Sequence, residues 1–353
     1  MFILETYAVA IVFCVITMFC WGSWANTQKL AGKKWRFELF YWDYVLGILL
    51  LSLVFAFTVG STGESGRSFL EDMAQADASS LGYAFLGGVV FNAANILLVA
   101  AIAIAGMSVA FPVGIGLALV LGVMLNYAAE QKGDPVLLFA GVALVTAAIA
   151  LDAMAYRKLP GQTKGGKKGL LLSVACGVLM SLFYFLVMQS LAKVQLASGE
   201  LVDVNAANLA MGTLQEGKLS PYSGNVVFCL GIVLSNFLFN TLIMVRPIEG
   251  EPVPFSAYFK GRAQDHLWGV VGGFIWAIGM SLNIVAAGVA GPAISYGLGQ
   301  GATLVAAIWG VFIWKEFKDG PPENRKLLCL MFAAYVIGLA LVVMAKIPAL
   351  AIL

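Results

Sequence analysis

The stretch that decides the fold is LWGVVGGFIWAIGMSLNIVAAGVAGPAISYGLGQGATLVAAIWGVFIW, Leu267 to Trp314, which contains no Asp, Glu, Lys or Arg. A second run with the same property extends from Ala78 to Ala129. About 20 apolar residues in a helix cross a hydrocarbon core of about 30 Å. Each run is therefore too long for one crossing and suits two. Because Gly and Pro end one helix and start the next, we expect the breaks at Gly106 to Ser108 and at Gly291 to Ala293.

The two runs match each other at small residues when one is shifted by 185 positions. The matched pairs are Gly87 with Gly272, Gly88 with Gly273, Gly106 with Gly291, Gly114 with Gly299, Gly116 with Gly301 and Leu119 with Leu304. Upstream, Leu46 to Ile48 falls on Leu230 to Ile232 at a shift of 184. A constant shift over several helices indicates two homologous halves, which is typical of many secondary transporters.

Composition places the chain in a membrane, because 61% of its 353 residues are hydrophobic and only 11% are charged. The other uncharged runs are Thr6 to Gln28, Tyr44 to Gly63, Pro135 to Leu151, Gly169 to Ala192, Leu219 to Val245 and Leu327 to Ala345. With two hairpins they make ten crossings, so we expect an all-α integral membrane protein with a 5+5 inverted repeat. The predicted parts are residues 1–156, a basic cytoplasmic loop at 157–168, and residues 169–353 with an external insertion at 193–220.

The distribution of basic residues predicts the orientation. With both termini outside, sixteen of the 21 Lys and Arg fall in cytoplasmic loops. Cytoplasmic loops of membrane proteins carry the excess of Lys and Arg. We therefore expect a multi-pass protein of the cell (inner) membrane with both termini outside.

The residues that metal or nucleophilic chemistry needs are sparse and scattered. The chain has one His, and its 5 Cys all lie in predicted spans without paired spacing. We predict no metal, no cofactor and no enzymatic activity. The expected partners are a small solute, the lipid bilayer and no nucleic acid, and the sequence leaves open whether a second copy of the chain binds.

Aromatic and amide side chains near the middle of the spans are the candidate solute ligands. Trp21, beside Gly22, suits either an interfacial belt or a cavity wall for a flat or ring-shaped solute. Asn92 and Asn95 share one helix face, where they either bond neighbouring helices or coordinate a solute. The predicted substrate-binding residues are Trp21, Asn92, Asn95, Trp276, Asn283, Tyr296 and Gln300.

A single carboxylate, Asp43, is the candidate for coupling transport to protons. It opens the second predicted span, where a helix-start role is the alternative. Asp152 and Glu5 are the other acidic residues near spans, and all three are expected towards the membrane surfaces. His266, the only histidine, is expected to be an interface residue rather than a titrating switch.

Several motifs of the second half resemble a known superfamily. Gly272 to Gly279 (GGFIWAIG), Gly291 to Gly301 (GPAISYGLGQG) and Trp309 to Phe317 (WGVFIWKEF) look like the glucose/ribose porter and rhamnose transporter branch of the drug/metabolite transporters. The first half adds Cys20 to Lys29, Tyr41 to Tyr44 and Gly87 to Tyr127, which are similar to the ureide permeases of that superfamily. The resemblance implies a site between helices 1 to 4 and 6 to 9, with helices 5 and 10 peripheral.

The predicted function is a secondary active permease that takes up a small uncharged polar solute. The resemblance implies a monosaccharide such as ribose or glucose, or a ureide or nucleobase, with proton coupling. The residues agree with a neutral solute, because no Lys or Arg lies at midplane depth to compensate an anion. The alternative is a drug or metabolite exporter of the same fold, which would need an apolar cavity without paired amides.

Overall fold

The structure is a computed structural model that describes residues 1–32, 35–63, 65–160, 166–247 and 250–347. Over these residues ten helical segments are long and apolar enough to cross a membrane, as predicted. They are α1 (Tyr7–Ser23) with α2 (Ala25–Ala31), α3 (Phe37–Phe57), α5 (Ala78–Ala105), the π-helix η1 (Phe111–Ile115) with α7 (Gly116–Ala129), α8 (Pro135–Arg157), α9 (Lys167–Ser190), α11 (Pro221–Val245), α12 (Ala263–Ala290), α13 (Pro292–Gly299) with α14 (Ala302–Ile308) and the π-helix η3 (Trp309–Ile313), and α15 (Glu323–Met344).

Both predicted hairpins break where the glycines stand. Gly106 ends α5 with φ of 74°, and Gly291 ends α12 with φ of 93°. Residues with a side chain rarely adopt this backbone region, so glycine ends a helix here at little cost. The short α6 (Met107–Ala110) follows the first break, and Pro292 opens α13 after the second.

The fourth and ninth spans are interrupted, which hydropathy did not predict. The π-helix η1 begins just before Pro112, whose ring removes a backbone N–H from the ladder. In the ninth span a turn at Gln300 and Gly301 separates α13 from α14. Interruptions of this kind are frequent at functional sites, and both lie beside the cavity described below.

Glycine contacts join the two halves at matching positions. A Cβ on Gly88 would lie 2.0 Å from the Phe228 carbonyl oxygen. A Cβ on Gly231 would lie 2.2 Å from the Phe85 carbonyl oxygen. In the matching contact, a Cβ on Gly273 would lie 2.2 Å from the Tyr44 carbonyl oxygen. These glycines let α5 cross α11 and α3 cross α12 at backbone distance.

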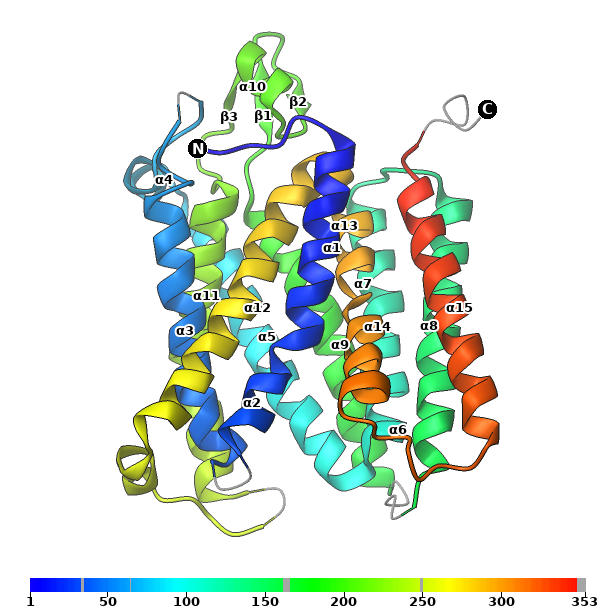
Figure 1. Cartoon of the computed structure of the whole chain (residues 1–353). Helices are drawn as coiled ribbons and strands as arrows, with labels where there is room; N and C mark the ends of the chain where they lie inside the picture. Colours follow the sequence, from blue (N-terminus) through cyan, green and yellow to red (C-terminus); the bar gives the residue numbers. More distant parts are fainter. Residues whose placement is uncertain (33–34, 64, 161–165, 248–249, 348–353) are drawn as a thin grey trace.

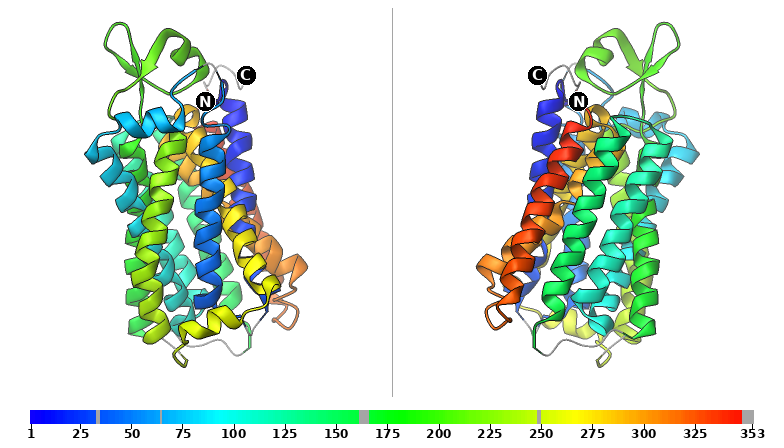
Figure 2. Two further views of the ribbon diagram at one scale, coloured as in Figure 1. Left: turned by 90° about the vertical axis from the view of Figure 1, so that its left-hand side faces the viewer. Right: turned by 90° about the vertical axis from the view of Figure 1, so that its right-hand side faces the viewer.

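Helices α8 and α15 pack against each other at one edge of the bundle (Figures 1 and 2). Gly141 and Gly338 face each other there, and a Cβ on Gly141 would lie 2.6 Å from the Gly338 carbonyl oxygen. Leu171 of α9 and Leu238 of α11 are examples of large apolar side chains that stay exposed on the bundle. Lipid contact explains such exposure in a protein of this composition.

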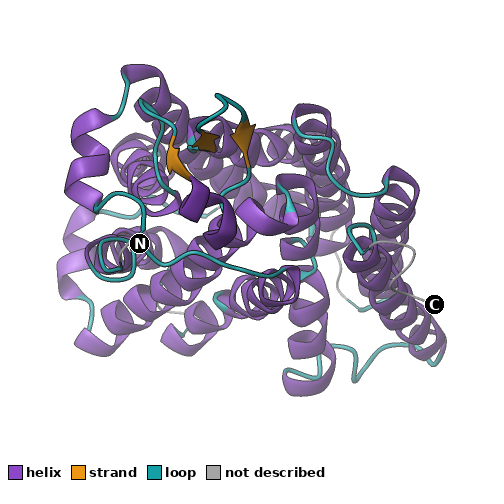
Figure 3. Cartoon of the chain, turned by 90° about the horizontal axis from the view of Figure 1, so that it is seen from above, coloured by secondary structure: helices purple, strands orange, loops and turns teal. Residues whose placement is uncertain are grey.

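A small cap stands over the helix ends on the side where both termini lie (Figures 1 and 3). It contains the antiparallel strands β1 (Val194–Leu196), β2 (Leu201–Val202) and β3 (Gly212–Leu214), in the order β2-β1-β3, and the helix α10 (Ala206–Met211). The sequence predicted an insertion at 193–220 but no strands.

Further segments connect the spans. On the side of the cap, α4 (Phe69–Gln75) precedes α5. At the opposite end, η2 (Phe255–Lys260) precedes α12. Residues 161–165 of the predicted basic loop lie outside the described residues.

Candidate solute cavity

A cavity of about 190 Å³ lies between six of the spans, and we call it the inner cavity. Its lining is Trp21, Gly22, Trp24, Ala25, Phe91, Asn95, Leu98, Phe111, Ile115, Met180, Phe183, Trp276, Gln300, Ala302, Thr303 and Ala306. These residues come from the first, third, fourth, sixth, eighth and ninth spans. Helices α8 and α15 contribute none of them, in agreement with a peripheral position. The second and seventh spans also contribute none, although the resemblance placed them around the site.

Aromatic rings close the buried end of the inner cavity. The Trp276 side chain packs with its ring 4.8 Å from Phe91 and stacks on Trp21 at 5.9 Å with 15° between the planes. The Trp21 indole Nε1 donates a hydrogen bond to the Trp276 carbonyl oxygen at 3.3 Å. Phe91, Phe183 and Trp276 are buried, whereas Ala25 at the other end is exposed. The inner cavity thus has a buried aromatic end and a more exposed end near Ala25.

Two glycines create the space that the Trp21 indole occupies. A Cβ on Gly279 would lie 2.7 Å from Trp21 Cδ1, and one on Gly299 would lie 2.8 Å from Trp21 Cζ3. Only glycine at both positions lets the indole lie between α12 and α13 in this orientation. The sequence placed Trp21 beside Gly22. The glycines that make room for the Trp21 indole, Gly279 and Gly299, come instead from distant spans.

Two amides supply hydrogen-bonding groups to the inner cavity. Asn95 is 6% exposed, and its Nδ2 donates to the Tyr41 hydroxyl at 3.0 Å. Gln300 is 9% exposed and lies at the turn between α13 and α14. The Gln300 side chain lines the cavity at this interruption of the span. Each amide offers both a donor and an acceptor.

The inner cavity has no charged lining. No Asp, Glu, Lys or Arg occurs among the described residues that border it. A charged solute in this apolar environment would lose its hydration without a compensating partner, at a cost of several kcal/mol. The cavity is therefore suited to an uncharged solute that can stack on aromatic rings and bond to amides.

The structure brings together four of the seven predicted binding residues, namely Trp21, Asn95, Trp276 and Gln300, as lining residues. It places Asn92 behind them. Asn92 donates to the Ser235 hydroxyl at 2.9 Å and accepts from the Tyr41 hydroxyl at 3.0 Å, so it joins α5 to α11 and α3. Asn92 therefore bonds to neighbouring helices, which was one of its two predicted roles. Its bond to Tyr41 also helps to hold the Tyr41 hydroxyl against Asn95.

Asn283 and Tyr296 lie outside the cavity lining, in a buried layer towards the termini. Asn283 Nδ2 donates to the Ser295 carbonyl oxygen at 3.0 Å, and Ser295 Oγ donates to the Asn283 carbonyl oxygen at 2.8 Å. Tyr184 shares a hydrogen bond with Ser295 Oγ at 3.1 Å, and the Tyr296 hydroxyl donates to the Ala118 carbonyl oxygen at 3.2 Å. We call Tyr184, Asn283, Ser295 and Tyr296 the closed layer. In this structure Asn283 and Tyr296 bond to other groups of the protein and do not line the inner cavity.

Sequence reasoning missed the phenylalanines of the lining and Tyr41. Phe91 was identifiable, because the shift of 185 places it on Trp276. Phe111 falls in the same way on Tyr296. Tyr41 carried no signal of its own, since a Tyr near the start of a span is usually an interfacial residue.

Asp43 lies away from the inner cavity, in a buried polar cluster between α3 and α12. Its Oδ2 is 2.9 Å from His266 Nδ1, and its Oδ1 accepts from the Tyr258 hydroxyl at 2.5 Å. Burial and the hydrogen bond to Asp43 raise the pKa of Tyr258, which lies outside the spans. Gly269 permits the contact, because a Cβ there would lie 2.4 Å from Asp43 Cβ. The sequence analysis did not connect His266 with Asp43.

Comparison with known proteins adds independent support for a transporter. The family model for ureide permeases matches residues 40–165. Ureide permease 1 of Arabidopsis thaliana is 24% identical and aligns over 96% of this chain and 97% of its own length. The chain is similar to ureide permeases along nearly its whole length. Ureide permease 4 of the same plant is 23% identical over 97% of this chain and 98% of its own. These relatives are transporters, not enzymes.

A solved structure supports the fold. It is titled "Crystal structure of protein", and it superposes with a TM-score of 0.57 at 15% identity, over 96% of this chain and 98% of its own. This likeness concerns the fold alone. The matched region at 40–165 includes Tyr41 to Tyr44 and Gly87 to Tyr127, the stretches in which the sequence resembled ureide permeases.

Proposed function

We propose that this protein is a membrane permease for a small, uncharged, planar solute of the ureide or nucleobase class. One observation carries the proposal: the inner cavity combines stacked indoles with two amides and no charged side chain. The names of the curated relatives point to the same solute class.

The chemistry of such a solute matches that of the cavity walls. A ureide or nucleobase ring has N–H donors and carbonyl acceptors around its edge and flat faces above and below. The edge groups would bond to the Asn95 and Gln300 amides, each of which can both donate and accept. The faces would pack on Trp21 or Trp276, and such stacking contributes about 1–3 kcal/mol for a base on an aromatic side chain. A hydrophobic drug would leave the Gln300 amide and the remaining hydrogen-bonding groups of Asn95 without partners, so the exporter alternative is disfavoured.

Transport requires a second state in which the closed layer opens and the inner cavity closes. The shift of 185 relates Leu98 and Phe111 of the cavity lining to Asn283 and Tyr296 of the closed layer. Leu98 and Phe111 of the first half thus line a cavity, whereas the equivalent residues Asn283 and Tyr296 of the second half lie in the closed layer. Matching glycine contacts of α5 with α11 and of α3 with α12 support the same 5+5 inverted repeat. An exchange of these two arrangements would expose the solute to the other side of the membrane.

We assign proton coupling to Asp43, with His266 and Tyr258 as its partners. The cluster couples α3, α12 and η2, so a change in protonation would alter the contact between the two halves. In the proposed topology the protein lies in the cell (inner) membrane with both termini outside, so the cluster faces the cytoplasm.

Uptake into proteoliposomes tests the proposed function. Allantoin, uracil, ribose, glucose and rhamnose would be compared as labelled solutes, with and without an inward proton gradient. We expect allantoin or uracil to accumulate and the sugars to be taken up at background levels. Sugar uptake alone would move the assignment to the monosaccharide class. No uptake of any of the five solutes would contradict the permease proposal.

A further inference from the structure

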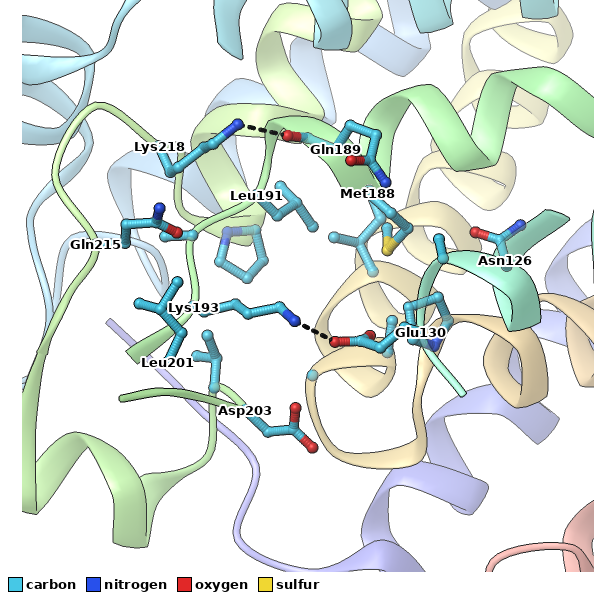
Figure 4. Close-up of a pocket in the computed structure, with 18 of the residues that line it drawn as sticks. Asn126, Glu130, Met188, Gln189, Leu191, Lys193, Leu201, Asp203, Gln215 and Lys218 are labelled. Atoms are coloured by element: carbon cyan, nitrogen blue, oxygen red, sulfur yellow. Dashed lines mark hydrogen bonds and ion pairs between the residues drawn. The ribbon is translucent and has the colours of Figure 1, made fainter. Parts of the chain in front are cut away.

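A second cavity, larger than the first, lies on the side of the termini between the cap and the ends of α7, α9 and α12 (Figure 4). Its volume is about 280 Å³, and we call it the outer pocket. It lies beyond the closed layer from the inner cavity, since Ile284 of its wall follows Asn283 of that layer in the chain.

The charged side chains of the outer pocket already bond to the protein. Glu130 forms ion pairs with Lys193 at 2.6 Å and with Lys132 at 3.0 Å. Asp203 of the cap also pairs with Lys132. The ammonium of Lys218 donates to a backbone carbonyl oxygen at the end of α9 at 2.8 Å (Figure 4). These contacts occupy the charged groups, so the outer pocket gives no sign of which ligand it would bind.

In the inner cavity, by contrast, a chain of hydrogen bonds leaves one polar atom for a solute. The chain starts at the Ile232 carbonyl oxygen of α11. This oxygen accepts from Asn92 Nδ2 at 3.3 Å and from the Ser235 hydroxyl at 3.1 Å. Because the hydroxyl hydrogen of Ser235 is used in this bond, its oxygen accepts the second N–H of Asn92, at 2.9 Å. Both N–H groups of Asn92 are therefore directed to α11.

This start fixes the direction of the bonds that follow. A carbonyl oxygen can only accept, so a reversed Asn92 amide would place its own oxygen against that of Ile232. Asn92 Oδ1 instead accepts from the Tyr41 hydroxyl at 3.0 Å. The one hydrogen of this hydroxyl is then used, so the Tyr41 oxygen accepts from Asn95 Nδ2 at 3.0 Å. The nitrogen of the Asn95 amide is thus held at Tyr41.

The oxygen of the Asn95 amide is the end that remains for a solute. Asn95 lines the inner cavity, and its Oδ1 accepts no hydrogen bond from the described residues. This oxygen retains accessible surface, whereas the unpartnered side-chain oxygen of Asn126 at the outer pocket is sealed from it. An acceptor in apolar surroundings is costly without a partner, and a donor of the solute would offset this cost.

We propose that the inner cavity selects solutes with a hydrogen-bond donor that reaches the side-chain oxygen of Asn95, and that Tyr41 and Asn92 impose this requirement. In a ureide or nucleobase the donor is a ring N–H. The inference rests on the proposed function for the place of the solute, whereas the required donor follows from the direction of the hydrogen bonds. Tyr41 and Asn92 are positioning residues, because neither lines the cavity.

Uracil and 1,3-dimethyluracil form a matched pair of probes. Both are neutral planar rings with the same carbonyl groups, but in the second compound methyl groups replace the N–H donors. Binding of each would be measured by calorimetry on the full-length protein in nanodiscs. We expect the wild-type protein to bind uracil about tenfold or more tightly than 1,3-dimethyluracil, because the analogue leaves the Asn95 oxygen without a partner.

Two substitutions should relax this preference to about threefold or less. In Tyr41→Phe the Asn95 amide loses the acceptor that orients it and can turn its N–H groups to the cavity. In Asn92→Leu the Tyr41 hydroxyl can donate to the Asn95 oxygen, which permits the same rotation. Tyr44→Phe is the matched control, since Tyr44 is equally buried on α3 and its hydroxyl has no partner among the described residues. It should keep the wild-type preference.

The larger size of 1,3-dimethyluracil would also disfavour its binding, but that effect does not depend on the Tyr41 hydroxyl. A preference for uracil that is unchanged in both Tyr41→Phe and Asn92→Leu would therefore overturn the proposal. Equal binding of the two probes to the wild-type protein, or no binding of either, would also overturn it.

The uptake assay separates this inference from the proposed function. If none of the five solutes is transported but the preference for uracil depends on Tyr41 and Asn92, the permease proposal fails and the donor requirement stands. If uracil or allantoin is transported while both probes bind equally, the permease proposal stands and the donor requirement fails.

Discussion

The inner cavity and the outer pocket lie in one helical bundle and have opposite chemistry. The inner cavity has stacked indoles and two amides without a charge, whereas the outer pocket has five charged side chains, most of them in ion pairs. Depth explains the difference. An ammonium among the spans loses hydration that the protein must replace, while the same group near the cap keeps contact with water. The inner cavity therefore suits a neutral solute, whereas the charged side chains of this comparison lie at the outer pocket.

No titratable side chain occurs among the described residues that line the inner cavity, and Asp43 is the proposed source of proton coupling. Asp43→Asn should abolish accumulation of solute against its gradient while solute exchange continues, because the asparagine cannot change its charge. Asp265→Asn is the matched control, since Asp265 pairs with the exposed Arg262 at the start of the same helix α12. Counterflow and proton-driven uptake measured side by side would check this. Unchanged accumulation would remove Asp43 from the mechanism.

The aromatic end of the inner cavity is expected to control affinity for a neutral ring. Trp276→Leu should reduce uptake of the neutral solute about tenfold or more, given a stacking contribution of about 1–3 kcal/mol. Phe228→Leu is the control, because Phe228 stacks on Trp276 at 6.1 Å without lining the cavity. Initial uptake rates over a range of solute concentrations would separate the two variants. Equal losses would indicate a packing role rather than a contact with solute.

The closed layer separates the two sites, and Ser295 is its most bonded member. Ser295→Ala would remove the hydrogen bonds of the Ser295 hydroxyl with Tyr184 and with the Asn283 oxygens, at about 1–3 kcal/mol, and should favour the state open towards the termini several-fold. The bond from Asn283 Nδ2 to the Ser295 carbonyl oxygen would remain. Cys14 lies in contact with Ser295 and is buried, so it provides a native reporter.

Maleimide labelling of Cys14, quantified by mass spectrometry, should become several-fold faster in Ser295→Ala. Ser173→Ala is the control, because Ser173 is equally buried but bonds only to the Gly169 carbonyl oxygen of its own helix. Equal labelling rates in the two variants would show that the hydrogen bonds of Ser295 do not hold the layer closed.

The smallest effect concerns the charged wall of the outer pocket. The pKa of Glu130 is lowered from 4.5 in the folded state, so its stabilising contribution is present above that value and is lost as the pH falls through the folded pKa. Glu130→Gln should loosen the cap by about 1 kcal/mol at neutral pH. Hydrogen exchange of Val194 to Leu196 would measure this. The difference from wild type should vanish in acid, and a difference that persists there would have another cause.

Much of the fold followed from local features of the chain. Uncharged runs fixed ten spans, and Gly106 and Gly291 ended helices where expected, because a positive φ is a property of the residue itself. The matching glycines Gly88 and Gly273 also proved to be positions of close helix contact. The strands of the cap were not predicted, since each has no more than three residues and depends on pairing across the insertion.

Prediction of the site was less complete, for a physical reason. A polar side chain within a span must find a hydrogen-bond partner, but the sequence does not say whether that partner is a helix or a solute. The structure gives Asn92 and Asn283 protein partners and leaves Asn95 and Gln300 at the cavity. The contact of Asp43 with His266 joins residues distant in sequence, so no local pattern revealed it.

By itself the sequence determined that this chain has ten segments able to cross a membrane, that two of its helices end at Gly106 and Gly291, and that its two halves match at small residues, because hydropathy and backbone freedom belong to individual residues. Only the tertiary structure decided which polar groups face a cavity, that Phe91 joins Trp21 and Trp276 there, and that charged groups surround a second pocket. These properties depend on which faces of distant helices meet, and that is set by packing.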